Sequence, residues 1–179
     1  MNQALTEISG LFEGARQYAV ANNTYVWVVF DDSPHGDEDR LLVATLASKT
    51  GIELAPWGTD DTASGSARTR LLSKVRTFKQ VKLSGAGVFG SDKISDLPEV
   101  PDAGDPGDSD FVLRLPGEGE ENFEKAVEFT PSGEARNAAT LIGVIEIGLQ
   151  PTHGRVADAD NVAVIRINGL TGQSTIYRP

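Results

Sequence analysis

The sequence predicts an α+β fold in which one N-terminal helix packs on antiparallel β-sheet. Apolar residues recur at helical spacing over one long segment near the N-terminus, whereas later apolar runs are mostly short and rich in β-branched and aromatic residues. The 19 glycines and 9 prolines supply the turns that such strands need. A chain of 179 residues fits a single domain, residues 1–179.

The predicted helix covers about residues 4–22. Its apolar positions fall on one stripe, and the side chains expected to join the helix to the sheet are Leu5, Ile8, Phe12 and Ala15. Glu13 and Arg16 lie off the stripe at a spacing that suits an i,i+3 ion pair. Asn22 and Asn23 are expected to end the helix, because asparagine tolerates the left-handed conformation of a C-terminal cap.

Strands are predicted for most of the remaining chain. Residues 25–30 are apolar on both alternating faces, which predicts a central strand. The other predicted strands are 40–49, 80–84, 111–115, 126–130, 141–149, 162–168 and 174–178. Helical spacing in 68–78 predicts a short helix. Residues 90–109, rich in Pro, Asp and Gly, predict a long surface loop.

The composition narrows the function classes. The formal net charge of −10 opposes long-range attraction to nucleic acid or anionic membranes. The apolar runs are far shorter than the roughly 20 residues that cross a bilayer as a helix. The chain has no cysteine, so disulfides and thiol chemistry are excluded.

Three segments carry a resemblance to a known family. They are the run E-G-A-R-Q-Y-A-V-A-N-N-T-Y-V-W-V at 13–28, the segment V-E-F-T-P-S-G at 127–133, and the closing hairpin at 164–179. Together they resemble type IV pilin-like proteins, namely the minor pseudopilins of the H type of type II secretion. The closest likeness is to the group called Verru_Chthon cassette protein D. The likeness covers about residues 4–48 and 125–179.

This resemblance implies a structural subunit of a type IV pilus-like or type II secretion-like filament, with no enzymatic activity and no cofactor. Its partners would be other pilin-like subunits in the cell envelope, outside the cytoplasm. An apolar helix upstream of Met1, with a prepilin-peptidase site, would anchor it in the inner membrane before assembly. Gly133 would form a tight turn, and Gly169 and Gly172 would form a hairpin turn with positive φ.

Two other functions stay open. One is a free extracytoplasmic β-rich domain that binds protein or carbohydrate. The other is a DNA-binding minor pilin, because residues 68–82 hold six basic residues with no acid between them. The candidate DNA contacts in this run are Arg70, Lys74 and Arg76. Alternatively, the run is an ordinary basic face.

A calcium site is a further candidate. Its carboxylates would be those of Asp102, Asp105, Asp108 and Asp110. Carboxylate oxygens spaced by glycine can ligate Ca²⁺, but the spacing is not that of an EF-hand. A solvated acidic loop is the alternative interpretation.

No catalytic site is predicted. Residues 85–90 match the pattern G-x-G-x-x-G, but the segment before Pro98 is too short for the helix that a dinucleotide site requires, so a loop is expected. His35 and His153 are the two histidines, and neither has a neighbouring partner in the sequence that would make it a catalytic base.

Overall fold

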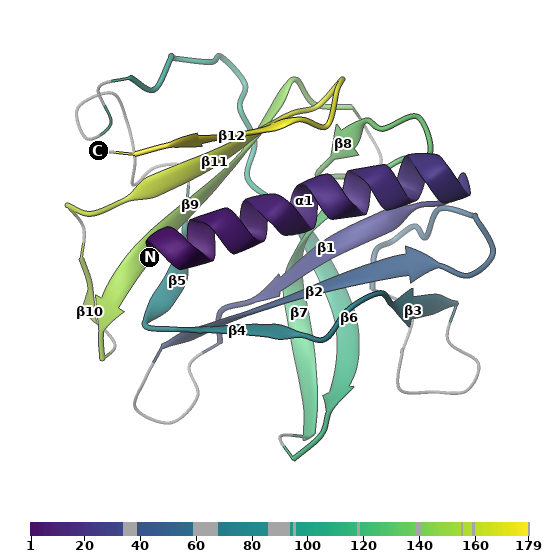
Figure 1. Cartoon of the computed structure of the whole chain (residues 1–179), viewed down its shortest axis with the longest axis horizontal. Coiled ribbons are helices and arrows are strands. Elements are labelled where there is room, and N and C mark those ends of the chain that lie inside the picture. The colour runs from purple at the N-terminus through teal and green to yellow at the C-terminus, as the bar shows by residue number, and fades with distance from the viewer. Residues whose placement is uncertain are drawn as a thin grey trace.

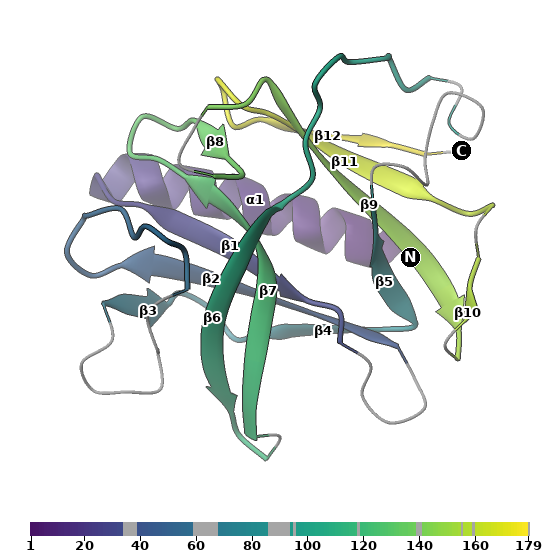
Figure 2. The same cartoon turned by 180° about the vertical axis from the view of Figure 1, so that it is seen from behind.

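The computed structural model describes residues 1–33, 39–58, 68–85, 94, 96–117, 119–138, 141–154, 156–158 and 160–178. Within them lie one helix and two antiparallel sheets, which confirms the predicted α+β class. Figure 1 shows helix α1 in front of both sheets, and Figure 2 shows the sheets from behind. The described part of the chain holds no helix with the length and apolar content needed to cross a membrane.

Helix α1 spans Asn2–Asn22, close to the predicted range. Its buried residues recur every three or four positions: Ala4, Leu5, Ile8, Phe12, Ala15 and Ala19. Asn23 follows in the left-handed conformation, with φ 48° and ψ 51°, and this cap returns backbone N–H groups to the carbonyls of Ala19 and Val20. The predicted helix stop is therefore confirmed.

The larger sheet, which we call sheet I, has seven strands within the described residues. They are β1 Val26–Asp31, β2 Arg40–Ser48, β3 Thr69–Leu71, β4 Arg76–Lys79, β6 Gly107–Leu115, β7 Gly119–Phe129 and β8 Ala135–Arg136. The order is β3-β2-β1-β7-β6, with β4 also paired to β2 and β8 to β7. Every residue of β1 is buried and both its neighbours are antiparallel, as predicted for a central strand.

The smaller sheet, sheet II, has five strands within the same ranges. They are β5 Val81–Ser84, β9 Val144–His153, β10 Val156–Ala157, β11 Ala163–Asn168 and β12 Ser174–Tyr177. Strands β10, β9, β11 and β12 lie in that order, and β5 pairs with β9. The short strands β8 and β10 were not predicted, because two residues carry too little pattern to recognise.

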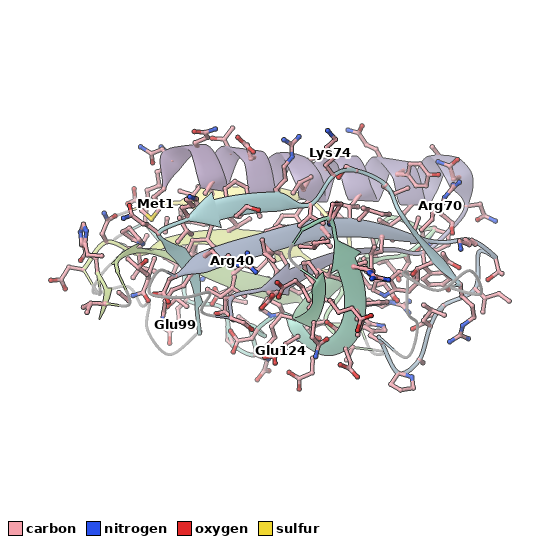
Figure 3. The ribbon with its side chains drawn as sticks, turned by 90° about the horizontal axis from the view of Figure 1, so that it is seen from below. Met1, Arg40, Arg70, Lys74, Glu99 and Glu124 are labelled. Atoms are coloured by element: carbon pink, nitrogen blue, oxygen red, sulfur yellow. The ribbon has the colours of Figure 1, made fainter. Side chains whose placement is uncertain are left out.

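Helix α1 bridges the two sheets. It contacts β1, β2 and β7 of sheet I together with β11 and β12 of sheet II. The apolar cluster between the helix and both sheets, which we call the helix core, contains Phe12, Val28, Phe129, Ile147 and Ile165 among others. The domain therefore has one layer of helix on one layer formed by both sheets (Figure 3).

The face of sheet I turned away from the helix is also covered. A second core there contains Trp27, Leu46 and Phe111, together with Leu54 and Trp57 from the segment that follows β2. Trp27 and Phe111 pack with their ring centroids 5.7 Å apart. Sheet I is thus buried on both faces, which explains why β1 is apolar at every position before Asp31.

The predicted helix at 68–78 is wrong. This segment forms β3 and β4, which both pair with β2 and share its outer edge. Its apolar residues do not make one stripe: Leu72 and Phe78 pack on the helix core, Val75 packs on the second core, and Leu71 is exposed. Pairing with the outer edge of β2 satisfies backbone hydrogen bonds of that edge, and this outweighs the local helical spacing.

The surface-loop prediction for 90–109 is wrong in part. Ile94 and Leu97 are buried against sheet II, Gly104 forms an isolated bridge with Ile145, and β6 already begins at Gly107. The backbone of Gly104 exchanges hydrogen bonds of 3.0 and 2.8 Å with β9. The described part of the segment therefore ties sheet I to sheet II on the side opposite the helix.

Candidate functional site

The interface between helix α1 and the sheets is the first candidate site. Leu5, Ile8, Phe12 and Ala15, the four residues predicted to pack there, are at most 1% exposed and belong to the helix core. Phe12 lies at its centre, with ring centroids 6.0 Å from Phe30 and 6.2 Å from Phe129. The helix is therefore held by the same core that joins the two sheets.

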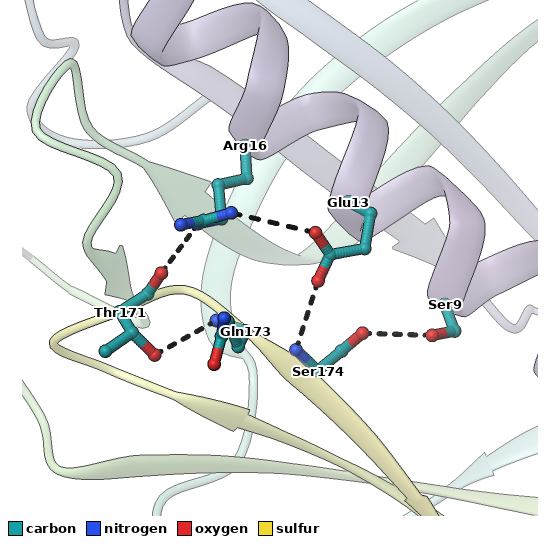
Figure 4. Close-up of polar contacts among 6 residues, drawn as sticks. All are labelled: Ser9, Glu13, Arg16, Thr171, Gln173 and Ser174. Carbon is teal, nitrogen blue, oxygen red and sulfur yellow. Dashed lines mark hydrogen bonds and ion pairs between the residues drawn. The ribbon is translucent and has the colours of Figure 1, made fainter.

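A polar contact fixes the helix to the C-terminal hairpin (Figure 4). The hydroxyls of Ser9 and Ser174 are 2.9 Å apart, and the backbone N–H of Ser174 donates to the Glu13 carboxylate at 3.4 Å. Arg16 pairs with Glu13 at 3.7 Å, which confirms the predicted ion pair, and donates to the Thr171 carbonyl at 2.6 Å. The two predicted partners thus also reach across to sheet II.

Glycines let the turns approach this contact closely. Gly133 and Gly172 have positive φ, 87° and 65°, as expected for tight turns. A Cβ atom on Gly172 would lie 2.9 Å from Cδ of Arg16. Gly169 was expected to have positive φ and does not. A Cβ there would meet the Ile142 carbonyl oxygen at 1.6 Å, so close backbone approach explains this glycine.

The candidate DNA contacts lie exposed along the outer edge of sheet I, on β3, on β4 and on the connection between them. Arg70 and Arg76 are both paired with residues of the helix core, so they share the helix side of the sheet. The Arg70 guanidinium lies 5.6 Å from the ring centroid of Tyr18 and donates to the Tyr18 hydroxyl. Figure 3 shows Arg70 and Lys74 beside α1.

The candidate calcium ligands are not brought together. Asp102, Asp105, Asp108 and Asp110 all lie in described residues, which contain no group of three or more Asp, Glu, His or Cys side chains that could hold a metal. Asp108 instead pairs with Lys125 at 2.6 Å. This hydrogen bond, with the Lys125 charge, lowers the pKa of Asp108. Of the four carboxylates, that of Asp108 therefore binds a lysine of β7 instead of taking part in a metal site.

The other motifs lie at the end of β9, directly after β5, or outside the described residues. His153 ends β9 and is exposed, in a hairpin with β10. His35 lies outside the described residues. Of the G-x-G-x-x-G segment only Gly85 is described, directly after β5, and positions 86–90 lie outside the described ranges.

A second candidate site among the described residues is the carboxyl of Glu128, on β7. It is fully buried, and no hydrogen bond of normal geometry from the described residues reaches either oxygen. Glu128 lies opposite Trp27 of β1 on one side and Arg136 of β8 on the other. Arg136 in turn lies 4.0 Å from Glu53, which belongs to the segment that covers the second core. Four elements therefore meet at one buried acid.

The surroundings of Glu128 favour its protonated form. Burial raises the pKa of Glu128 to about 8, and the negative charge of Glu53 adds to this rise. The charge of Arg136 and the indole N–H groups of Trp27 and Trp57 oppose it. Arg136 also forms an ion pair with Glu134 at 2.8 Å, so its positive charge is shared between Glu134 and Glu128. A perturbed buried acid of this kind is a candidate functional group.

Sequence reasoning missed Glu128. Val127 and Phe129 on either side of it pack in the helix core, so alternation places Glu128 on the opposite face. In a sheet covered on one side, that position would face water. Only the apolar residues on both faces of β1 indicated that the opposite face of sheet I is also covered.

Comparison of the chain with models of protein families, with curated proteins and with solved structures gives no match in any of the three. The fold is that of one N-terminal helix packed on two antiparallel sheets, an arrangement compatible with a pilin-like head.

Proposed function

We propose that this chain is the head domain of a pilin-like subunit that assembles into a type IV pilus-like or type II secretion-like filament. In this proposal its work is assembly and not catalysis, and its partners are other pilin-like subunits in the cell envelope. The domain would be held by an apolar helix continuous with α1, first in the inner membrane and then in the filament.

The observation that carries the proposal is the construction of helix α1. Its apolar face bridges both sheets over the whole length from Ala4 to Ala19, and the Glu13–Arg16 contact fixes it to the C-terminal hairpin. Its C-terminal end is capped by Asn23 in the left-handed conformation. Because the helix is fixed to both sheets, a force along its axis would be transmitted to the whole domain.

The test is the form of the protein in its native cell envelope. Intact mass and N-terminal sequencing should find roughly 20 apolar residues upstream of Met1, ending in a processed and methylated N-terminus, in the membrane fraction. A mature chain that starts near Met1 and is recovered in the soluble fraction would discard the filament. The free binding domain for protein or carbohydrate would then be the better proposal.

A second candidate function, DNA binding by a minor pilin, is favoured by one observation. The edge of sheet I brings Arg70 and Arg76 to the same side, with Lys74 between them in the chain, and all three side chains are exposed. Basic side chains in such a row can contact successive phosphates. The net charge of −10 opposes this function.

A further inference from the structure

A pocket of about 240 Å³ lies where the two sheets meet. Sheet II contributes Ser84 of β5 and Gly148 of β9, and sheet I contributes Lys125 of β7. Asp32, directly after β1, and Pro106, directly before β6, also line it. At about 30 Å³ for each water molecule, the pocket has room for about eight waters. A ligand that fills it would have a similar number of non-hydrogen atoms.

The Ser84 hydroxyl indicates that the ligand of this pocket is polar. Ser84 is only 8% exposed, and its hydroxyl oxygen has no hydrogen-bond partner among the described residues. A buried polar group without a partner is destabilising, so such groups are rare in folded proteins and each calls for an explanation. A polar ligand lying against Ser84 would supply the missing hydrogen bond, because a hydroxyl can both donate and accept.

The pocket carries charges of both signs. The Asp32 carboxyl forms no ion pair with the described residues, and burial together with the negative charge of Asp31 raises its pKa, which the charge of Lys82 opposes only in part. Lys125 donates one hydrogen bond within the described chain, to Asp108 at 2.6 Å, so two of the three N–H groups of its ammonium remain for a ligand. A positive group on the ligand would stabilise the carboxylate, and a negative group would bind the ammonium.

We propose that this pocket binds a small zwitterion of the amino-acid class, a single molecule that carries both an ammonium and a carboxylate group. The ligand ammonium pairs with Asp32, the ligand carboxylate pairs with Lys125, and Ser84 bonds to the polar group nearest to it. A simple amine would meet the positive charge of Lys125, and a simple carboxylate would meet the negative charge of Asp32, so neither matches the pocket as well. Helix α1, which carries the filament proposal, contributes no residue to this pocket, so the two proposals stand independently.

The test is isothermal titration calorimetry of the whole chain with alanine, β-alanine and 4-aminobutyrate as separate ligands. These amino acids place progressively more carbon atoms between the ammonium and the carboxylate, so together they sample the separation of the two charged groups in the pocket. We expect at least one of them to bind with a Kd of about 1 mM or lower. Propylamine and butyrate each keep only one of the two charged groups, and should bind at least about tenfold more weakly.

Substitutions then assign the binding to the pocket. Asp32→Asn and Lys125→Gln each remove one charge, and should weaken binding of the tightest amino acid by about tenfold or more. Glu120→Gln and Lys79→Gln remove an exposed acid and an exposed base outside the pocket, and these matched controls should change the affinity by less than about twofold. Ser84→Ala should weaken binding without lowering the urea midpoint of unfolding, because no hydrogen bond within the described chain is lost.

Three results would overturn the proposal. The first is that none of the three amino acids binds. The second is that propylamine or butyrate binds as tightly as the best amino acid, which would mean a site for one charge only. The third is equal weakening by the pocket variants and the matched controls, which would place the binding elsewhere on the protein. If Asp32→Asn or Lys125→Gln does not fold, Ser84→Ala decides, and an unchanged affinity in that variant rejects the site.

Discussion

At the scale of single residues, close backbone approach explains several glycines better than turn geometry does. Gly107 begins β6 where the chain crosses from sheet II to sheet I. A Cβ there would lie 1.6 Å from the Asn137 carbonyl oxygen and 2.8 Å from the Trp57 ring. Neither neighbour can move away easily, because one is backbone and the other is buried in the second core.

Gly107→Ala is therefore expected to lower the free energy of unfolding by about 3 kcal/mol, the upper part of the usual range for overpacking. Urea unfolding measures this loss. Gly143→Ala is the matched control, because no described atom lies within 4 Å of its Cβ and its φ is not positive. The control should change stability by less than about 0.5 kcal/mol. Similar losses in both variants would contradict the close approach.

At the scale of secondary structure, helix α1 is expected to stabilise both sheets at once. Phe12→Ala removes the ring between Phe30 and Phe129, and should lower the free energy of unfolding by about 3–5 kcal/mol. Val20→Ala on the same helix removes a side chain that is 50% exposed, and should change it by less than about 1 kcal/mol. Urea unfolding followed by circular dichroism compares them, and equal losses would show that the helix is a loosely attached appendage.

The same scale shows what the sequence could predict. Helix α1 was recognised from its periodic apolar face, and strand β1 from being apolar on both faces, and both patterns coincide with burial. Strands β3 and β4 were not, because their pairing with β2 depends on a strand more than 20 residues earlier in the chain. The cluster around Glu128 depends on four separate elements, and no local pattern contains that information.

At the scale of the whole molecule, the distribution of charge bears on the choice between a filament subunit and a DNA-binding minor pilin. A net charge of −10 repels nucleic acid at long range, and this repulsion is screened as salt is added. Direct phosphate contacts respond in the opposite way, because added salt weakens binding that releases counterions. The salt dependence of binding therefore separates a basic row that contacts phosphates from one that does not.

The DNA-binding candidate predicts that Arg70, Lys74 and Arg76, all changed to Gln, weaken binding to duplex DNA. They should also make the plot of log K against log salt shallower by about one unit per lost contact. The control triple is Arg114, Lys125 and Arg178 to Gln, which changes the net charge equally and lies elsewhere in the chain. Fluorescence anisotropy at several salt concentrations measures both. Equal weakening by the two triples would mean that only net charge matters, and absence of binding at low salt would leave assembly as the remaining role of the basic row.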